Sequence, residues 1–198
     1  MGRTKGIMNL MKGVFFASTA CILMLSNQHL SSENTSVKAV PVASNWDEVQ
    51  CNGGRCKMQF PSKPEHVSEK MSVPEEGYDL RYDAYISSLE KQAVFMLLVA
   101  QYPEFVDERY AHMSLEGFLN GILSHNPNNQ LIFADLLLVE GHEALDFFIR
   151  TGSVYFKGRA LMVKNHLYLM AMECEMQNYD ESRYNVFVNS FKLTAVPK

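Results

Sequence analysis

Four apolar runs between Gln130 and Cys174 dominate the pattern of hydrophobic and polar positions along the chain. The runs are eight to eleven residues long and rich in Val, Ile, Phe and Tyr, with short breaks at 140–142, 151–153 and 165–166. Short runs of this composition, divided by glycine and asparagine, are typical of strands joined by tight hairpins. We therefore predict an antiparallel meander. Its strands carry apolar residues on both faces, so we expect a cover on each face.

Three further strands are expected before the meander. Residues 57–60 form a short one, and Asp79–Ser87 alternates between apolar and polar positions like a half-exposed strand. Ala93–Tyr102 is apolar on both faces, which predicts a central, covered strand. Two prolines open the stretch 61–77, and we expect a loop there.

Two helices complete the predicted elements. Ser114 can cap the first, whose apolar stripe runs from Leu115 to Leu123. Asp180 can cap the second, whose stripe runs from Tyr184 to Phe191. The predicted fold class is α+β: an α/β/α sandwich with a largely antiparallel sheet of about six or seven strands and two main helices.

Length and composition indicate one globular domain, which we place at residues 46–198. The chain has 198 residues, of which 47% are hydrophobic and 20% are charged. Its net charge is −4, and without residues 1–25 it becomes −7, because 15 basic and 22 acidic residues remain. No basic stripe with interleaved aromatic residues occurs, so we expect no nucleic-acid partner.

Residues 1–25 are expected to act as an export signal or membrane anchor. Arg3, Lys5 and Lys12 precede thirteen mostly apolar residues, a run too short to cross a bilayer comfortably. Ser18-Thr-Ala-Cys21 resembles a bacterial lipobox, with Ser18 in place of the usual leucine, so Cys21 is a possible lipid attachment site. Cleavage further along and an uncleaved anchor are the alternatives. Residues 26–45 lack periodicity and are expected to form a flexible tether.

Cys51 and Cys56 bracket an Asn-Gly-Gly turn signal. In an exported protein, two cysteines at this spacing favour a structural disulfide over free thiols. A redox or metal-binding role is the less favoured alternative, because no nearby histidine supplies further ligands.

The order of the elements resembles a known class of proteins. The residues that carry the resemblance are Phe60-Pro61-x-x-Pro64, Gly141-x-x-Ala144-x-x-Phe147, Arg159, Leu167-Tyr168 and Phe187-x-x-Ser190-Phe191. Over about residues 48–194 the chain is similar to bacterial exported proteins of the PsbP-like class. These share an α/β/α sandwich with the photosystem II extrinsic protein PsbP and the Ran-binding Mog proteins. The resemblance implies a binding or assembly role and assigns no functional residue.

No catalytic, zinc-helix, phosphate-loop or dinucleotide-binding motif occurs in the sequence. We therefore expect a non-enzymatic protein of the bacterial periplasm or cell envelope, without a cofactor and tethered to the membrane through its N-terminus. Its expected partner is another envelope protein or component, bound through residues 61–77, residues 103–113 or the Glu140–Asp146 rim. The alternatives are an enzyme that uses this rim, a copper carrier that uses the Met170–Met176 face, and a secreted effector.

Overall fold

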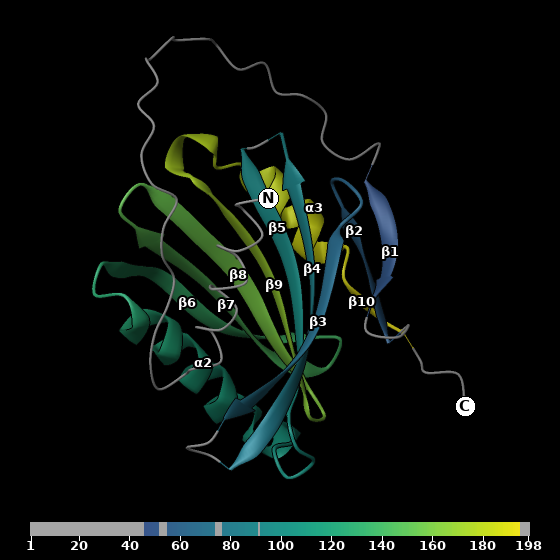
Figure 1. Ribbon diagram of the computed structural model, residues 1–198. Coiled ribbons are helices and arrows are strands. Elements are labelled where there is room, and N and C mark those ends of the chain that lie inside the picture. Colours follow the sequence, from purple (N-terminus) through teal and green to yellow (C-terminus); the bar gives the residue numbers. More distant parts are fainter. Residues whose placement is uncertain (1–45, 52–54, 74–76, 91, 195–198) are drawn as a thin grey trace.

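The computed structural model describes residues 46–51, 55–73, 77–90 and 92–194, which form two antiparallel sheets and two main helices (Figure 1). The larger sheet has seven strands in the order β3-β4-β5-β9-β8-β7-β6, and the smaller has three in the order β1-β2-β10. The strands are β1 (Asp47–Cys51), β2 (Cys56–Phe60), β3 (Glu65–Val73), β4 (Tyr78–Leu89), β5 (Ala93–Gln101), β6 (Asn129–Val139), β7 (His142–Thr151), β8 (Val154–Val163), β9 (His166–Glu175) and β10 (Lys192–Leu193). The helices are α2 (Ala111–His125) and α3 (Glu181–Asn189), preceded by the single turns η2 (Glu108–Tyr110) and η3 (Met176–Asn178).

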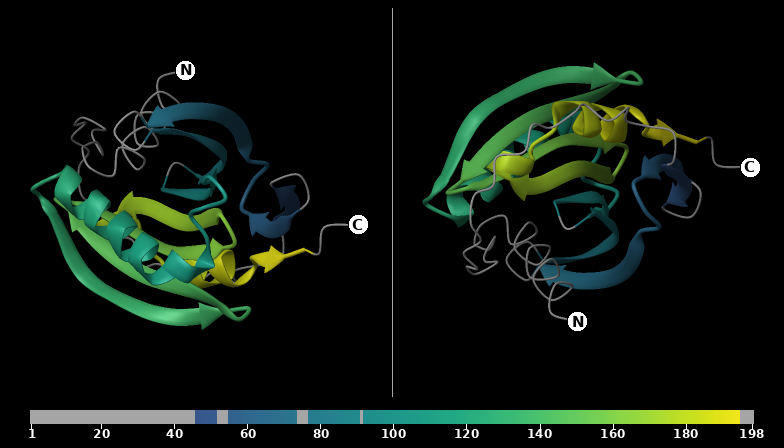
Figure 2. Two further views of the ribbon diagram at one scale, coloured as in Figure 1. Left: turned by 90° about the horizontal axis from the view of Figure 1, so that it is seen from below. Right: turned by 90° about the horizontal axis from the view of Figure 1, so that it is seen from above.

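This architecture confirms the predicted α+β class, with a seven-stranded antiparallel sheet and two main helices. The large sheet curves strongly, and its edge strands β3 and β6 lie at opposite sides of the molecule (Figure 2). Helix α2 packs on one face, over β6, β7 and β8, and α3 packs with the small sheet on the other face.

Two hydrophobic cores lie on the two faces. The core on the α2 side contains the buried stripe of that helix: Ala111, Leu115, Phe118, Leu119 and Ile122. The core on the α3 side joins side chains of the large sheet, the small sheet and α3, among them Phe60, Phe95, Met170 and Phe187. Burial on both faces agrees with the apolar pattern of β5 and of the last three strands of the meander.

The predicted meander is confirmed, and its turns explain the hairpins. Each connection has two residues, and each includes a residue with positive φ. Glu140 and Gly141 have φ values of 51° and 85°, Gly152 has 59° and Lys164 has 52°. Two consecutive left-handed residues give a turn whose twist matches the twist of the paired strands.

Two local predictions were wrong. Within the range predicted as a loop, Glu65–Val73 forms strand β3, which pairs with β4 along nine residues. Ser114 does not cap the first helix, since α2 begins at Ala111 after the turn η2. The strand predicted at residues 57–60 is confirmed as β2, and it belongs to the small sheet.

The predicted cap of the second helix is confirmed. The Asp180 side chain accepts hydrogen bonds from the backbone N–H groups of Ser182 and Arg183, at 2.9 and 3.2 Å. These two donors have no partner inside the helix, so the cap fixes the start of α3.

Candidate functional site

Strand β6 carries the most unusual surface of the described chain. Eight large hydrophobic side chains of the described residues are exposed, and half of them lie on this one strand. Their exposed fractions are 44% for Leu131, 49% for Ile132, 48% for Leu136 and 71% for Leu138. Single exposed apolar residues are common on soluble proteins, but clusters of them mark interaction surfaces.

Strand pairing places three of these side chains on the face that α2 covers. Leu131 pairs with Ile149, Leu136 pairs with Leu145, and both partners belong to the core under α2. Leu138 points the same way as Leu136, because alternate residues of a strand share a face. Ile132 lies at an irregularity in the pairing between Leu131 and Phe133, which breaks the register of the edge.

Strand β6 is also a free edge. It pairs with β7 on one side, and among the described residues no strand pairs with its other side. Its outward backbone N–H and C=O groups therefore find no sheet partner in that part of the chain. An exposed, long, apolar edge is a template for pairing with another chain.

The other edge of the sheet is protected in the usual way. Strand β3 (Glu65–Val73) carries Glu65, His66, Glu69 and Lys70 within nine residues, and charged side chains discourage edge-to-edge pairing. Across eleven residues, β6 carries only one charged residue, Asp135. The contrast indicates that the apolar character of β6 does not follow from its position at an edge.

Acidic groups border the apolar edge. Asp135 lies in β6 itself, and Glu143 is the register partner of Leu138. Within the described residues neither carboxylate has a hydrogen-bonded or ion-paired cation. Glu143 shares the face of Leu136 and Leu138 and Asp135 lies on the opposite face, so one carboxylate lies near the edge strand on each side of the sheet.

The inward side of β6 is held firmly. Phe133 packs against Phe148 with ring centroids 5.9 Å apart, and the Lys157 ammonium lies 5.5 and 5.2 Å from these two rings. The Lys157 Nζ donates to both carboxylate oxygens of Glu181 at 2.7 Å and to the hydroxyl of Tyr179 at 3.0 Å. This cluster ties the start of α3 to β8, β7 and β6, so the edge strand is presented on a rigid support.

Electrostatics at the cluster follow from this arrangement. Burial alone would raise the pKa of Glu181, but the hydrogen bonds from Lys157 and Tyr179 outweigh it and lower that pKa. Burial raises the pKa of Tyr184, whose hydroxyl is buried without a hydrogen-bond partner, and the charge of Asp146 adds to the effect. Lys157 lies 4.6 Å from the Tyr184 ring, so the ring face rather than the hydroxyl stabilises the ammonium.

The polar side chains of the Glu140–Asp146 rim do not converge on one point. His142 Nδ1 lies 3.2 Å from Glu108, whereas Asp146 binds Arg159 through two hydrogen bonds at 2.5 and 2.8 Å. Among the described residues, no group of three His, Cys, Asp or Glu side chains could hold a metal ion. Met170 and Met172 are buried core residues next to Cys174, whose pKa burial raises to about 11.

Cys51 and Cys56 are directly opposed residues of the β1–β2 hairpin, and both are fully buried. The structure holds them as free thiols, and the Cys51 Sγ donates to the Val49 carbonyl at 3.7 Å. The hydrogen bond with Cys51, followed by burial, raises the pKa of Cys56. The fold thus places the two cysteines side by side, as a disulfide between them requires. The disulfide itself stays a prediction.

Cys21, the export signal and the tether lie outside the described residues. Within the described part, no helix is long and apolar enough to cross a membrane.

Sequence reasoning missed the β6 surface because it treated the whole meander as covered. One signal could have found it. A four-stranded meander has two outer strands, and only the strand next to β5 gains a further neighbour from the earlier part of the chain.

Comparisons with known proteins give the fold. No family model and no curated protein sequence matches the chain. Among solved structures, the cyanobacterial PsbP protein CyanoP from Synechocystis sp. PCC 6803 matches with a TM-score of 0.54 and 14% identity, covering 81% of this chain and 98% of that one. A structure from Bacteroides thetaiotaomicron VPI-5482 matches with a TM-score of 0.40 and 9% identity, covering 75% of this chain and 48% of that one. The predicted resemblance is confirmed, and the chain has a PsbP-like fold.

Proposed function

We propose that this is an exported, membrane-tethered bacterial envelope protein whose domain binds another protein through strand β6. The observation that carries the proposal is the free edge with four exposed large hydrophobic side chains: Leu131, Ile132, Leu136 and Leu138. The positively charged start and apolar run of residues 1–25 support export.

The proposed occupant is an extended segment of the partner. A strand added to β6 would pair with its outward N–H and C=O groups and cover the side chains of Leu136 and Leu138. The uncompensated carboxylates of Asp135 and Glu143 favour a segment that combines apolar residues with lysine or arginine.

A second copy of this chain fits the edge less well. Antiparallel pairing of β6 with its own copy, centred on Ala134, Asp135 or Leu136, brings the two Asp135 carboxylates directly or diagonally opposite each other. Like charges at such positions destabilise a strand pair. The proposed partner is therefore a different protein.

Site-specific photo-crosslinking tests the surface in cells that produce the full chain. A photoreactive phenylalanine analogue at Leu138 should form an adduct with one partner protein. The same analogue at Ser68, an exposed residue of the opposite edge strand β3, is the matched control. Equal adducts at both positions, or an adduct only with another copy of this chain, contradict the proposal.

Reconstitution with the identified partner tests the pairing itself. Binding should slow amide hydrogen exchange along Asn129–Val139 and leave β3 unchanged. Leu138→Lys should weaken binding at least tenfold, because it places a charge in the apolar contact. Ser68→Lys, which changes net charge equally, should not.

The anchor is tested separately. Labelling cells with a palmitate analogue should mark the natural chain and spare Cys21→Ala. Equal labelling of both removes the lipid anchor and leaves the β6 proposal intact.

A further inference from the structure

One end of the large sheet carries a row of polar side chains on the α3 side. Strand pairing places Lys70, Arg81, Gln101 and His166 next to one another on β3, β4, β5 and β9. Paired residues of neighbouring strands point to the same face. The His166 ring stacks near Tyr168, which belongs to the core on the α3 side. Arg81 and Gln101 are exposed, so the row is open to solvent there.

Arg55 reaches this row from the start of β2. Its Nη1 lies 2.8 Å from Nε2 of His166, a side chain that is only 7% exposed. Burial, followed by the charges of Arg55 and Lys164, lowers the pKa of His166 to about 4. The imidazole is therefore neutral at pH 7, and it accepts the hydrogen bond from Arg55. This contact orients the guanidinium, and no other described residue takes up its remaining N–H donors.

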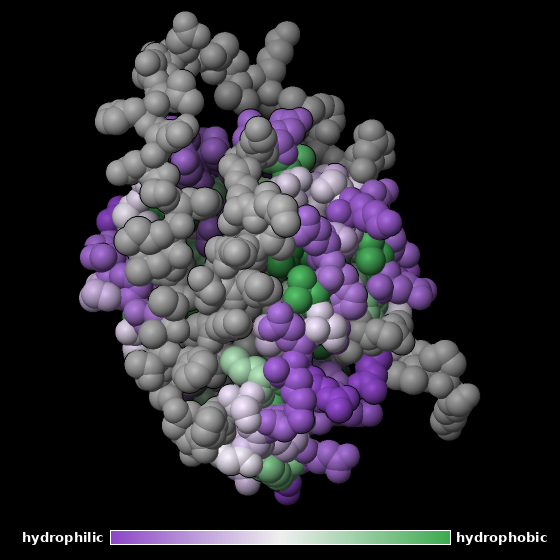
Figure 3. Space-filling view, viewed as in Figure 1, coloured by the Kyte–Doolittle hydropathy of each residue, from purple (hydrophilic) through white to green (hydrophobic). Residues whose placement is uncertain are grey.

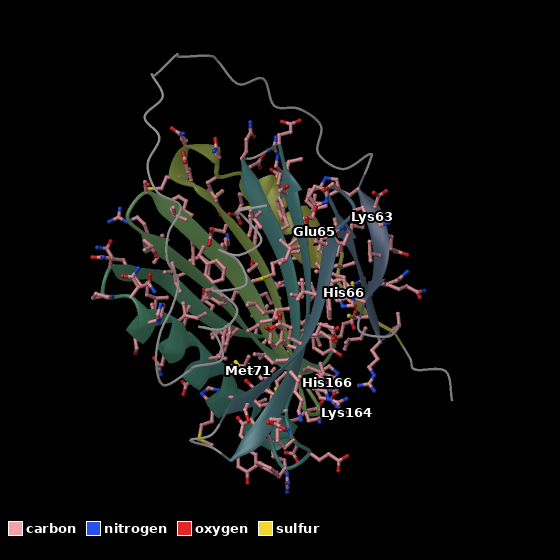
Figure 4. All side chains as sticks on the ribbon, viewed as in Figure 1. Lys63, Glu65, His66, Met71, Lys164 and His166 are labelled. Carbon is pink, nitrogen blue, oxygen red and sulfur yellow. The ribbon has the colours of Figure 1, made fainter. Side chains whose placement is uncertain are left out.

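Three cations at this end have no carboxylate partner among the described residues: Arg55, Arg81 and Lys164. Figure 4 shows Lys164 and His166 close together at the lower end of the sheet. In Figure 3 hydrophilic residues gather in the same region of this side of the molecule. The accumulation of unpaired cations runs against the net charge of −4 of the whole chain.

The nearby acidic groups are already engaged. Asp79 lies 2.5 Å from the Lys70 ammonium, and Asp83 lies 2.8 Å from Nε2 of His66. Glu108 accepts a hydrogen bond from a backbone N–H of the β8–β9 turn at 2.5 Å. Among the described residues, none of these three carboxylates forms an ion pair with the side chain of Arg55, Arg81 or Lys164.

The spacing lets the cations meet over one ligand. Neighbouring strands lie about 4.8 Å apart, so the Cα atoms of Arg81 and His166 are roughly 10 Å apart, with Gln101 between them. Arg81, from β4, and Arg55, which contacts His166 of β9, can therefore both bind one anion that lies above the Gln101 amide. Arginine binds phosphate through paired N–H donors, and three cations match a dianion better than a single carboxylate.

We propose that Arg55, Arg81 and Lys164 form a binding site for a phosphate group, with Gln101 as an additional hydrogen-bond donor. The phosphate belongs either to a small soluble molecule or to a lipid headgroup. This surface is separate from β6, so the proposal does not depend on the proposed protein partner.

The plain alternative is that Arg55 only attaches the β1–β2 hairpin to the sheet. Arg81 and Lys164 separate the two explanations, because their side chains make no hydrogen bond or ion pair with any other described residue. The test is therefore the double variant Arg81→Gln/Lys164→Gln of the full chain. Its control is Lys63→Gln/Arg150→Gln, which removes the same charge from exposed residues elsewhere.

Titration with inorganic phosphate, followed by amide NMR, gives the first result. We expect saturable shifts at Arg55, Arg81, Gln101 and Lys164, and an affinity about tenfold weaker in the double variant with an unchanged unfolding midpoint. Acetate at the same concentrations should give no saturable shift. Equal weakening in the control, saturation by acetate, or shifts confined to other residues overturns the proposal.

Cosedimentation with vesicles identifies the source of the phosphate. Greater binding to phosphatidylglycerol than to phosphatidylcholine vesicles, lost in the double variant only, assigns a lipid headgroup. Binding of inorganic phosphate without variant-sensitive vesicle binding assigns a soluble phosphate compound. The absence of both overturns the proposal.

Discussion

The ion pair between Lys157 and Glu181 should respond asymmetrically to substitution, because its two partners are buried to different degrees. The Lys157 side chain is 9% exposed and the Glu181 side chain is 51% exposed. Removing one partner of a buried pair is costly only when the remaining charge stays buried. Loss of Glu181 leaves a buried ammonium, whereas loss of Lys157 leaves a carboxylate that can turn to water.

The expected magnitudes follow from these environments. Glu181→Gln should lower the free energy of unfolding by about 2 kcal/mol, below the 3–5 kcal/mol of a fully buried pair, because the aromatic rings and Tyr179 still stabilise the ammonium. Lys157→Met keeps an unbranched side chain against the same rings and should cost only about 0–1 kcal/mol. The double variant should resemble Lys157→Met, which gives a coupling energy of about 2 kcal/mol.

Urea unfolding of the full chain at pH 7 measures the cycle, with the slope m checked for constancy. The surface pair Lys70–Asp79, whose side chains are 59% and 43% exposed, provides a control cycle in which no coupling is expected. A larger loss for Lys157→Met than for Glu181→Gln, or a coupling energy below about 0.5 kcal/mol, would refute the reasoning.

The same pair predicts a pH effect with a definite sign. The pKa of Glu181 is lowered in the folded state, so its contribution is present above the ordinary glutamate pKa and is lost as pH falls through the lowered value. The natural chain should therefore lose stability below about pH 4.3 in excess of the loss shown by Lys157→Met. Parallel pH profiles of the two proteins would contradict this expectation.

The remaining predictions concern a core glycine with its surface control, a buried histidine and a pair of cysteines. Gly158→Ala should destabilise by about 1–3 kcal/mol in urea, since its Cβ would lie 2.6 Å from Cζ of the fully buried Phe147, whereas Gly117→Ala on the open face of α2 should stabilise by about 0.5–1 kcal/mol. The pKa of His166 is about 4 in the folded state and about 6.5 in the unfolded state. The free energy of unfolding should therefore decrease by about 2–3 kcal/mol as the pH is lowered from 6.5 to 4, and His166→Gln should remove this decrease. The two opposed cysteines of β1 and β2 should resist alkylation in the exported, denatured protein until a reductant is added, and alkylation without reductant would disprove the disulfide.

Local signals predicted the parts of the fold that local chemistry decides. Gly141 and Gly152 adopt positive φ in the hairpins of the meander, as their turn positions suggested. Asp180 caps α3 as expected, because the cap depends on donors two and three residues away. In each case the partners lie within a few residues in the sequence.

Strand β3 escaped prediction because its pattern is that of a protected edge. Its residues from Glu65 to Val73 lack an apolar run, and their strand conformation depends on pairing with β4. A polar edge strand and a polar loop have similar sequences, and only the neighbouring strand distinguishes them. The small three-stranded sheet escaped for the same reason, since β10 is two residues long and joins β2 from the far end of the chain.

Strand β6 presents the reverse case. Its apolar residues on both faces predicted a covered strand, and the prediction of two covers was correct for β7, β8 and β9, whose apolar residues are mostly buried. The described chain leaves Leu136 and Leu138 exposed because β9, not β6, pairs with β5. Periodicity reports that a strand is suited to burial and does not report which molecule buries it. Strand β6 therefore has the composition of a strand that is covered on both faces, although no described residue covers Leu136 and Leu138. We assign that cover to another protein.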